Sequence, residues 1–383
     1  MPRRVSVVIV SEQTVQNVLF IKQMGGADFF YFVSTEKMEA KGRETSENIR
    51  KACSIEDYPS ETVTVLEDSL VDIQTKLNER VRLEDDDIIS VNITGGTKIM
   101  SLGVYNFFAN RGGADIYYIP IGKNALIKIF PFRRVMTGEL SARLSLREYM
   151  TASGVGFNEK LYERKNRLSK PAEVCQSIMD VYLDPDRRRE FVKVSERIRT
   201  SFRGKPVRRG ASGEESLLFE ECMTLAGLGM VFEDPERVTA QETRYVTGDW
   251  FEEYVYTAIQ SALGLPEDHI GMGLVLNKGI NNEYDVIFTR ENALYVIECK
   301  TDVSDSASDQ EARISALFTS TLYKAATLKK EFGLWVKYYL FAINDFSRLT
   351  DDQKKRAKQL DIKLVGTETL GDRSRLEAFI RDM

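Results

Sequence analysis

Three ionisable side chains lie in two strand-like runs at residues 284–289 and 293–300: Asp285, Glu298 and Lys300. Both runs are rich in β-branched and aromatic residues, and the short turn between them predicts a β-hairpin. Successive side chains of a strand point to opposite faces, so Glu298 and Lys300, two residues apart, face the same way. In an antiparallel hairpin, Asp285 lies opposite the end of the second strand. We therefore expect the three side chains to converge.

Two carboxylates and an ammonium group at one point favour metal-assisted hydrolysis of a phosphodiester. Asp285 and Glu298 would bind a hard divalent cation, Mg²⁺ or Mn²⁺, which polarises the phosphate and lowers the pKa of a bound water molecule. Lys300 would position that water or offset charge in the transition state. The alternative is a buried salt bridge at a hairpin end, because unpaired buried charge is costly.

Two helices are expected beside this hairpin. In residues 248–263 apolar side chains repeat at helical spacing, and Glu252 lies off that stripe, where it could face the metal; Glu253 is the alternative. Residues 309–331 predict a second helix, in which Tyr323 and Lys324 are candidate groups on the substrate side.

The composition makes several other catalytic sites hard to build. The chain of 383 residues has one histidine, His269, in a predicted loop, and four scattered cysteines without a Cys-x-x-Cys pair. This disfavours histidine phosphodiesterases, Ser–His–Asp hydrolases, zinc sites and disulfide frameworks, and it fits a reducing cytoplasm. No apolar run approaches the ~20 residues that a membrane helix needs. The length and the 43% hydrophobic content fit two or three globular domains.

The first 130 residues alternate between strand and helix patterns. Strands are predicted at 5–10, 27–34, 62–66, 88–93 and 114–119, with helices at 12–24, 44–53, 69–81 and 98–110. Repeated β-α units imply a parallel, doubly wound sheet. In such sheets ligands bind beyond the carboxyl ends of the strands.

Two polar loops are expected at that edge. Ser11 and Gln13 follow the first strand, and a second loop connects the fourth strand directly to a helix. The second loop has two glycines that allow close backbone approach, two hydroxyls, and a lysine at a helix N-terminus, which favours an anion: Thr94, Gly95, Gly96, Thr97 and Lys98. It is neither a GxxxxGK nor a GxGxxG motif, and its alternative is a tight strand-to-helix turn.

The middle of the chain, residues 136–240, predicts a mostly helical connector with an exposed loop at 203–213. Although the whole chain has a net charge of −5, residues 160–209 hold 15 Lys and Arg against 7 Asp and Glu. Such a region could follow a phosphate backbone, and the alternative is a set of solvated helix faces.

Two resemblances follow from these motifs. Asp285, twelve further residues and Glu298-Cys299-Lys300, with a helix before and after, resemble the PD-(D/E)xK nuclease superfamily. The run Asn92–Ser101, after a loop beginning at Ser11, resembles CARF domains, the sensors of cyclic oligoadenylates in type III CRISPR immunity, and in particular those fused to a restriction-endonuclease-like domain.

The resemblances imply an α/β fold with a Rossmann-like CARF domain at residues 1–135, a connector at 136–240 and a nuclease domain at 241–383. They imply a cytoplasmic homodimer whose first domain binds a cyclic oligoadenylate, most simply cyclic tetra-adenylate, through Ser11, Gln13 and residues 94–98. The second domain would cut DNA, RNA or both with Mn²⁺ or Mg²⁺, using Glu252, Asp285, Glu298 and Lys300. The alternatives are a ring nuclease that degrades the cyclic messenger, and a regulator that only binds nucleic acid.

Overall fold

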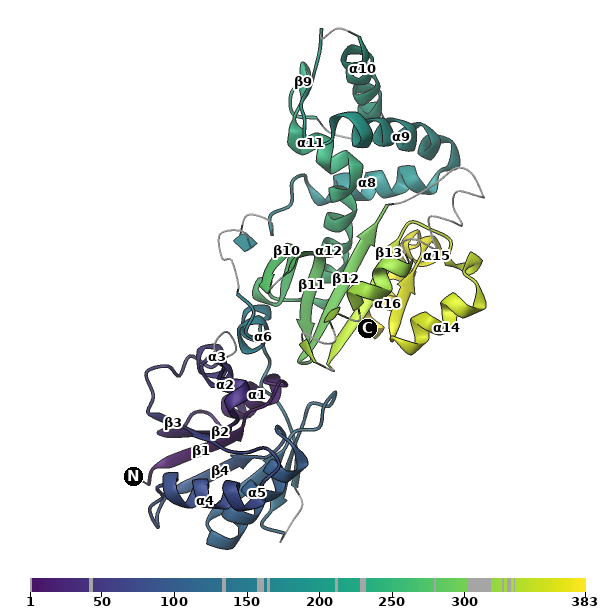
Figure 1. Ribbon diagram of the computed structural model, residues 1–383. Helices are drawn as coiled ribbons and strands as arrows, with labels where there is room; N and C mark the ends of the chain where they lie inside the picture. The colour runs from purple at the N-terminus through teal and green to yellow at the C-terminus, as the bar shows by residue number, and fades with distance from the viewer. Residues whose placement is uncertain are drawn as a thin grey trace.

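The computed structural model describes residues 2–40, 44–132, 136–156, 162–163, 166–210, 213–227, 232–278, 280–301, 318–325, 327–328, 332–333 and 335–383. One sheet domain forms the lower end in Figure 1, a second sheet lies in the middle, and the connector helices form the upper end. No helix of these described residues is long and apolar enough to cross a membrane.

The N-terminal sheet has the predicted parallel core. Its seven strands lie in the order β3-β2-β1-β4-β5-β6-β7, and the first five pair in parallel. The parallel strands are β1 (Arg4–Ile9), β2 (Phe29–Ser34), β3 (Ser60–Thr64), β4 (Ile88–Asn92) and β5 (Ala114–Tyr118). The helices between them are α1 (Val15–Gln23), α2 (Glu36–Glu39), α3 (Thr45–Ala52), α4 (Leu70–Arg80) and α5 (Lys98–Arg111). Strand β1 is buried after its first residue, as expected for the centre of a sheet covered on both faces.

Two antiparallel strands extend this sheet beyond the predicted set. They are β6 (Ala125–Phe130), which pairs with β5, and β7 (Met136–Glu139), which pairs with β6. In β6 only Leu126 is buried, so its sequence lacks the continuous apolar run that identifies the central strands. The sheet therefore continues to Glu139.

The connector consists of helices and one small ribbon. Its elements are α6 (Leu146–Ala152), α8 (Ala172–Leu183), α9 (Pro185–Arg197), η1 (Ile198–Phe202), β8 (Val207–Arg208), α10 (Glu214–Gly227), β9 (Arg237–Val238), α11 (Ala240–Arg244) and η2 (Tyr245–Asp249). The segment predicted as an exposed loop contains β8, which pairs with β9, and Val207 is fully buried. That part of the prediction was wrong, because a two-residue strand is too short to show a period.

The C-terminal sheet has five strands in the order β10-β11-β12-β13-β14. They are β10 (Ile270–Lys278), β11 (Ile280–Arg290), β12 (Ala293–Lys300), β13 (Val336–Ala342) and β14 (Ile362–Val365). The first three are antiparallel, and β12, β13 and β14 run in parallel. The surrounding helices are α12 (Trp250–Leu263), η3 (Glu267–His269), η4 (Phe346–Arg348), α14 (Asp351–Gln359), α15 (Thr367–Leu370) and α16 (Arg373–Asp382). The predicted helix at 309–331 is described at residues 318–325 and 327–328 and lies otherwise outside the described residues.

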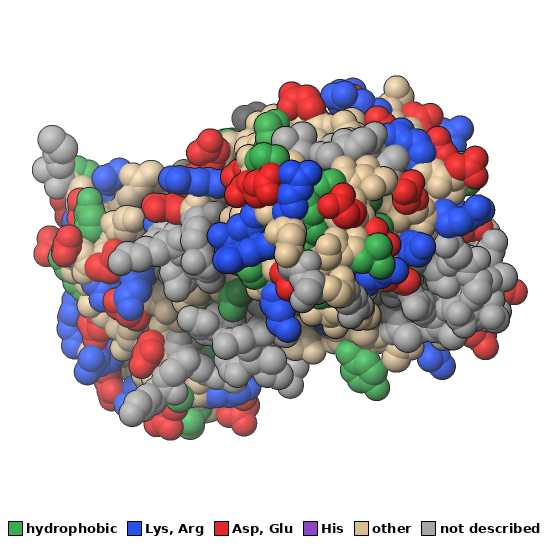
Figure 2. All heavy atoms as spheres, turned by 90° about the horizontal axis from the view of Figure 1, so that it is seen from above, with side chains coloured by type: hydrophobic (Ala, Val, Ile, Leu, Met, Phe, Trp, Pro, Cys, Tyr) green, Lys and Arg blue, Asp and Glu red, His purple; other side chains and the backbone are tan. Residues whose placement is uncertain are grey.

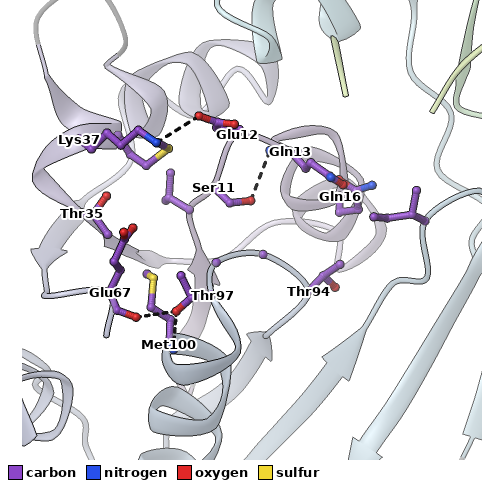
Figure 3. A pocket seen from close by; sticks show the side chains of 15 residues that line it. Ser11, Glu12, Gln13, Gln16, Thr35, Lys37, Glu67, Thr94, Thr97 and Met100 are labelled. Atoms are coloured by element: carbon purple, nitrogen blue, oxygen red, sulfur yellow. Dashed lines mark hydrogen bonds and ion pairs between the residues drawn. The ribbon is translucent and has the colours of Figure 1, made fainter. Parts of the chain in front are cut away.

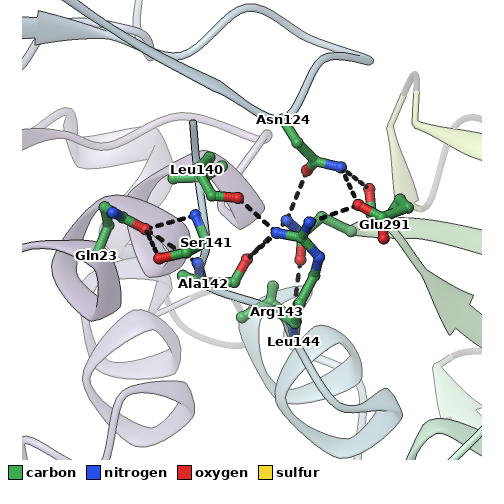
Figure 4. Close-up of polar contacts among 9 residues, drawn as sticks. Gln23, Asn124, Leu140, Ser141, Ala142, Arg143, Leu144 and Glu291 are labelled. Carbon is green, nitrogen blue, oxygen red and sulfur yellow. Dashed lines mark hydrogen bonds and ion pairs between the residues drawn. The ribbon is translucent and has the colours of Figure 1, made fainter. Parts of the chain in front are cut away.

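The turn of the β11–β12 hairpin lies at the junction between the two sheet domains (Figure 4). Glu291 and Asn292 have positive φ values of 49° and 62°, as a two-residue hairpin turn requires. Glu291 Oε2 lies 2.6 Å from Arg143 Nη2 and accepts a hydrogen bond of 2.7 Å from Asn124 Nδ2. Asn292, 1% exposed, accepts from the backbone N–H of Leu144. The hairpin therefore connects the junction at one end to the Asp285–Lys300 cluster at the other.

Candidate functional site

Strands β11 and β12 bring the three predicted residues of the hairpin together. The register pairs Val286 with Ile297, which puts Asp285 across from Glu298. Lys300 Nζ lies 3.1 Å from Asp285 Oδ2 and 2.7 Å from Glu298 Oε1. The backbone N–H of Cys299 also donates to Asp285 Oδ2 at 2.7 Å. Both carboxylates are buried, so their charges interact strongly.

The charges of the cluster shift the pKa values of its three residues in different ways. Burial and the charge of Glu298 raise the pKa of Asp285. Burial would also raise the pKa of Glu298, but the positive charges of Lys300 and Lys324 outweigh it and lower that pKa. Burial opposes the charge on Lys300, yet the two carboxylates raise its pKa. Lys300 is therefore held as an ammonium group, which suits it to offset negative charge rather than to accept a proton.

Of the two adjacent helix carboxylates, Glu252 faces the site. Burial first, and then the charge of Asp285, raise the pKa of Glu252 well above its ordinary value. Glu253 is buried elsewhere, where its Oε1 accepts a hydrogen bond of 2.7 Å from the backbone N–H of Ser169. Glu252 and Glu253 therefore lie in different surroundings, and the hydrogen bond between Glu253 and Ser169 links helix α12 to the connector.

The helix at residues 318–325 contributes a second lysine. Lys324 Nζ lies 2.6 Å from Glu298 Oε1, and Tyr338 Oη lies 3.5 Å from Glu298 Oε2. Tyr323, also expected on the substrate side, is 75% exposed. His269 lies in η3, where its Nδ1 is 3.0 Å from Thr289 Oγ1, so its contact is with the sheet and not with the cluster.

The oxygen atoms of this cluster fit a divalent cation. Lys300 Nζ is within 3.1 Å of carboxylate oxygens of Asp285 and Glu298 and of the carbonyl oxygen of Cys299. Three oxygens directed at one positive charge are the ligand type that Mg²⁺ and Mn²⁺ prefer. Among the described residues, no three acidic, cysteine or histidine side chains are grouped closely enough to form a metal site by side chains alone. A cation here would therefore need backbone or substrate oxygens as well.

A second site lies at the carboxyl edge of the N-terminal sheet (Figure 3). A cavity of about 390 Å³ opens between the loops that follow the parallel strands. Ser11, Gln13, Thr94, Gly95, Gly96 and Thr97 line it, as the sequence predicted. Lys98 opens α5, but its side chain is exposed and it does not line this cavity.

The glycine loop has its shape for physical reasons. A Cβ atom on Gly95 would lie 2.3 Å from the carbonyl oxygen of Ile9, so a side chain there would displace strand β1. Gly96 has a φ of +78°, and a Cβ atom on it would lie 2.5 Å from Ile9 Cγ2. Thr97 caps α5 by accepting a hydrogen bond from the backbone N–H of Met100. At these two glycines the loop therefore lines the cavity with backbone atoms and no side chains.

Sequence reasoning missed several groups that line the same cavity: Glu12, Gln16, Thr35, Lys37 and Glu67. Thr35 directly follows β2 and Glu67 comes soon after β3, so the rule that ligands bind beyond strand ends could have found them. Gln16 Oε1 and Thr35 Oγ1 are buried atoms that have no hydrogen-bond partner in the described part of the chain. Unsatisfied buried polar atoms of this kind are costly unless a ligand or water meets them.

Two family models match the chain. The model described as the Card1 CARF domain matches residues 5–149, and the model described as a Card1-like endonuclease domain matches residues 239–382. The chain therefore joins a CARF domain to a Card1-like endonuclease domain. The CARF match contains the cavity, and the endonuclease match contains Glu252 and the whole β10–β12 meander.

Solved structures share this fold. Can2 from Sulfobacillus thermosulfidooxidans in complex with cyclic tetra-adenylate aligns with a TM-score of 0.72 at 18% identity, over 99% of this chain and 98% of that one. Protein VC1899 from Vibrio cholerae aligns with a TM-score of 0.68 at 17% identity, over 99% and 98%. A type III CRISPR defence DNA nuclease activated by cyclic oligoadenylate aligns with a TM-score of 0.55 at 16% identity, over 90% of this chain and 46% of that one. No curated protein matched the chain significantly.

Proposed function

We propose that this CARF-domain endonuclease cuts DNA, RNA or both with Mn²⁺ or Mg²⁺ at the Asp285–Glu298–Lys300 cluster, and that cyclic tetra-adenylate in the N-terminal cavity activates it. The observation that carries the proposal is the position of Lys300 Nζ, 3.1 Å from Asp285 and 2.7 Å from Glu298, at the end of a buried hairpin. A protein that only bound nucleic acid would gain nothing from clustered carboxylates, which repel phosphate. We place this activity in the cytoplasm.

Each residue of the cluster has a role that follows from its electrostatics. Asp285 and Glu298 would hold the cation, which when bound stabilises charge on the phosphate and acidifies water. Lys300 remains an ammonium group and would offset the negative charge that grows on the phosphate in the transition state. Glu252 would support the cation or its water from helix α12, where burial and the charge of Asp285 raise its pKa. Lys324 keeps Glu298 ionised and oriented.

The N-terminal cavity has the chemistry of a nucleotide site. Hydroxyl, amide and backbone groups line it, and Gly95 and Gly96 admit a ligand close to the backbone. Its volume of about 390 Å³ lies within the range of small-molecule sites. A homodimer with twofold symmetry would bring two such cavities around a ring of even size, which supports cyclic tetra-adenylate as the ligand.

A route for activation runs along the contacts between the two domains. Gln13 lines the ligand cavity and also lines a smaller cleft with Phe332, Gly333 and Trp335, just ahead of β13. Strand β13 pairs with β12 through Glu298 and Lys300. A ligand that moved Gln13 would therefore act on the strand beside the cluster, which is the differential contact that an allosteric coupling requires.

The test is cleavage of single-stranded RNA, single-stranded DNA and supercoiled plasmid in Mn²⁺, with and without cyclic tetra-adenylate. Ligand-dependent cutting is expected, and it would also name the substrate. Cutting at the same rate without ligand would remove the sensor role. An intact substrate together with a degraded messenger would instead identify a ring nuclease. The variant Glu298→Gln should lose cutting and retain ligand binding; loss of both would give the cluster a structural role.

A further inference from the structure

Two arginines of the connector reach the edge of the nuclease cluster. Arg199, in η1, donates from Nη2 to the carbonyl oxygen of Thr247 at 2.6 Å and to Thr301 Oγ1 at 3.3 Å. Thr301 directly follows Lys300 in the chain, and consecutive Cα atoms are about 3.8 Å apart. A guanidinium from the middle of the chain therefore lies at the end of strand β12, one residue beyond Lys300.

Arg203 approaches the same site from the side of helix α12. Its Nη2 lies 4.0 Å from Asp249 Oδ1, and the two side chains are 50% and 41% exposed. Asp249 precedes Glu252 by three residues at the start of helix α12, so the two carboxylates lie on the same side of that helix. An ion pair this long and this exposed contributes little to stability, so Arg203 could leave Asp249 and bind a phosphate.

Several other basic groups of this part of the chain are already paired with carboxylates. Lys300 and Lys324 both lie against Glu298, within 2.7 Å. In the connector, Lys170 is paired with Glu242, Arg197 with Glu221 and Arg209 with Glu236. Arg199, in contrast, donates to two neutral oxygens, and among the described residues no carboxylate is paired with it. Figure 2 views the molecule from the connector end and shows Lys and Arg side chains gathered near the middle of that face.

We infer that Arg199 and Arg203 form a phosphate-binding wall of the nuclease site, so that the connector helps to hold the nucleic-acid strand beside the scissile bond. The inference rests on the proposed function and adds the residues that bind its substrate. Its physical basis is charge balance. The carboxylates of the cluster repel a polyanion, and positive groups beside them must compensate for this repulsion. The planar guanidinium matches phosphate geometry and can donate two hydrogen bonds at once.

The inference predicts a change in binding, separate from the chemical step. Binding of a labelled single-stranded DNA or RNA oligonucleotide would be measured over a series of KCl concentrations, with cyclic tetra-adenylate present and in a Glu298→Gln background that does not cut. Arg203→Ala should weaken binding about tenfold and reduce the slope of log affinity against log salt by about 0.7. Arg209→Ala, which removes an exposed arginine already paired with Glu236, is the matched control and should change the slope much less.

Two further measurements separate the outcomes. In the protein with Glu298 intact, Arg203→Ala should raise KM more than it lowers kcat. The reason is that the lost contact would bind the substrate equally in the ground state and in the transition state. Arg199→Gln, which can still donate to Thr247, should show the same loss of slope. If the Arg203 and Arg209 variants behave alike while the parent binds and cuts, the inference is overturned and the proposed function stands. If the parent does not bind the oligonucleotide, both are overturned.

Discussion

The side chain of Gln13, from the ligand cavity, lies against Gly333, which precedes strand β13 of the nuclease domain. A Cβ atom on Gly333 would lie 3.7 Å from Gln13 Cγ. Gly333 has a φ of +83°, a conformation that glycine adopts without strain. The sensor and the nuclease thus meet at a point where one residue has no side chain.

This contact makes Gly333→Ala a test of communication between the domains. Alanine at a φ of +83° would strain the backbone of the segment that contacts Gln13, so we expect the acceleration of cutting by cyclic tetra-adenylate to fall at least about fivefold. Gly113→Ala is the matched control, since Gly113 has a φ of +73° and a Cβ atom there would meet nothing within 4 Å. Equal activation ratios in the two variants would show that the contact carries no signal.

A comparison of the variants Lys300→Met and Lys363→Met tests the role of the Lys300 charge in catalysis. Lys300→Met removes the ammonium group between Asp285 and Glu298, and kcat should fall by about 10²–10³, as for other preorganised electrostatic groups. Lys363→Met removes a lysine of edge strand β14 whose ion pair with Asp361 is 62% exposed on both sides, and kcat should not change. The two values of kcat would be measured in saturating Mn²⁺. A Lys300→Met enzyme with normal kcat would assign the cluster a structural role.

Gln16 offers a test in which stability and ligand binding move in opposite directions. Its Oε1 is buried without a hydrogen-bond partner, so Gln16→Leu should leave the free protein as stable or more stable. The same change removes a polar group from the cavity and should weaken cyclic tetra-adenylate about tenfold. Thermal melting with and without ligand measures both effects. Unchanged affinity would mean that Gln16 does not meet the ligand.

A buried ion pair in the connector gives a prediction for stability. Lys170 and Glu242 lie 2.9 Å apart with 5% and 3% of their side chains exposed. Lys170→Met would strand a buried carboxylate and should lower the free energy of unfolding by about 3–5 kcal/mol. Arg209→Met, at an exposed pair, should cost about 0.5 kcal/mol or less. Urea unfolding of the three proteins would compare them.

The Lys170–Glu242 pair also makes the free energy of unfolding depend on pH, and the direction follows from the pKa shift of Glu242. Burial opposes the charge of Glu242, but hydrogen bonds from Thr239 and Lys170 outweigh it and lower the pKa below its ordinary value of 4.5. The folded state therefore binds fewer protons than the unfolded one, and the contribution of Glu242 is present above pH 4.5 and is lost as the pH falls through the lowered pKa. The cost of Lys170→Met should shrink over this acidic window, because Glu242 then becomes neutral. A cost independent of pH would contradict the assignment.

Local patterns were sufficient for much of this structure. Strand β12 begins and ends as predicted at Ala293 and Lys300, because a short apolar run between turn residues has few alternative boundaries. The convergence of Asp285, Glu298 and Lys300 followed from the twofold period of strands and from the antiparallel pairing of the hairpin.

What the sequence could not predict depends on contacts between distant segments. Strand β10 was missed because glycines at 271 and 273 interrupt its apolar run, and it is stabilised by pairing with β11. Glu252 and Glu253 are neighbours with equal propensities, and only the packing of Ser169 against Glu253 separates them. Arg199 carries no local motif; its significance comes from Thr301, more than a hundred positions later.

The turn at Glu291 and Asn292, of which Asn292 is buried, limits which domains can be exchanged between such proteins. Arg143, Asn124 and the backbone of Leu144, all outside the endonuclease match, satisfy the polar atoms of that turn. A nuclease domain cut out of this chain, or joined to a foreign sensor, would expose those atoms or leave them unpaired. A chimera should therefore fold well only if Asn124 and the junction segment at 140–144 are transferred with the nuclease domain.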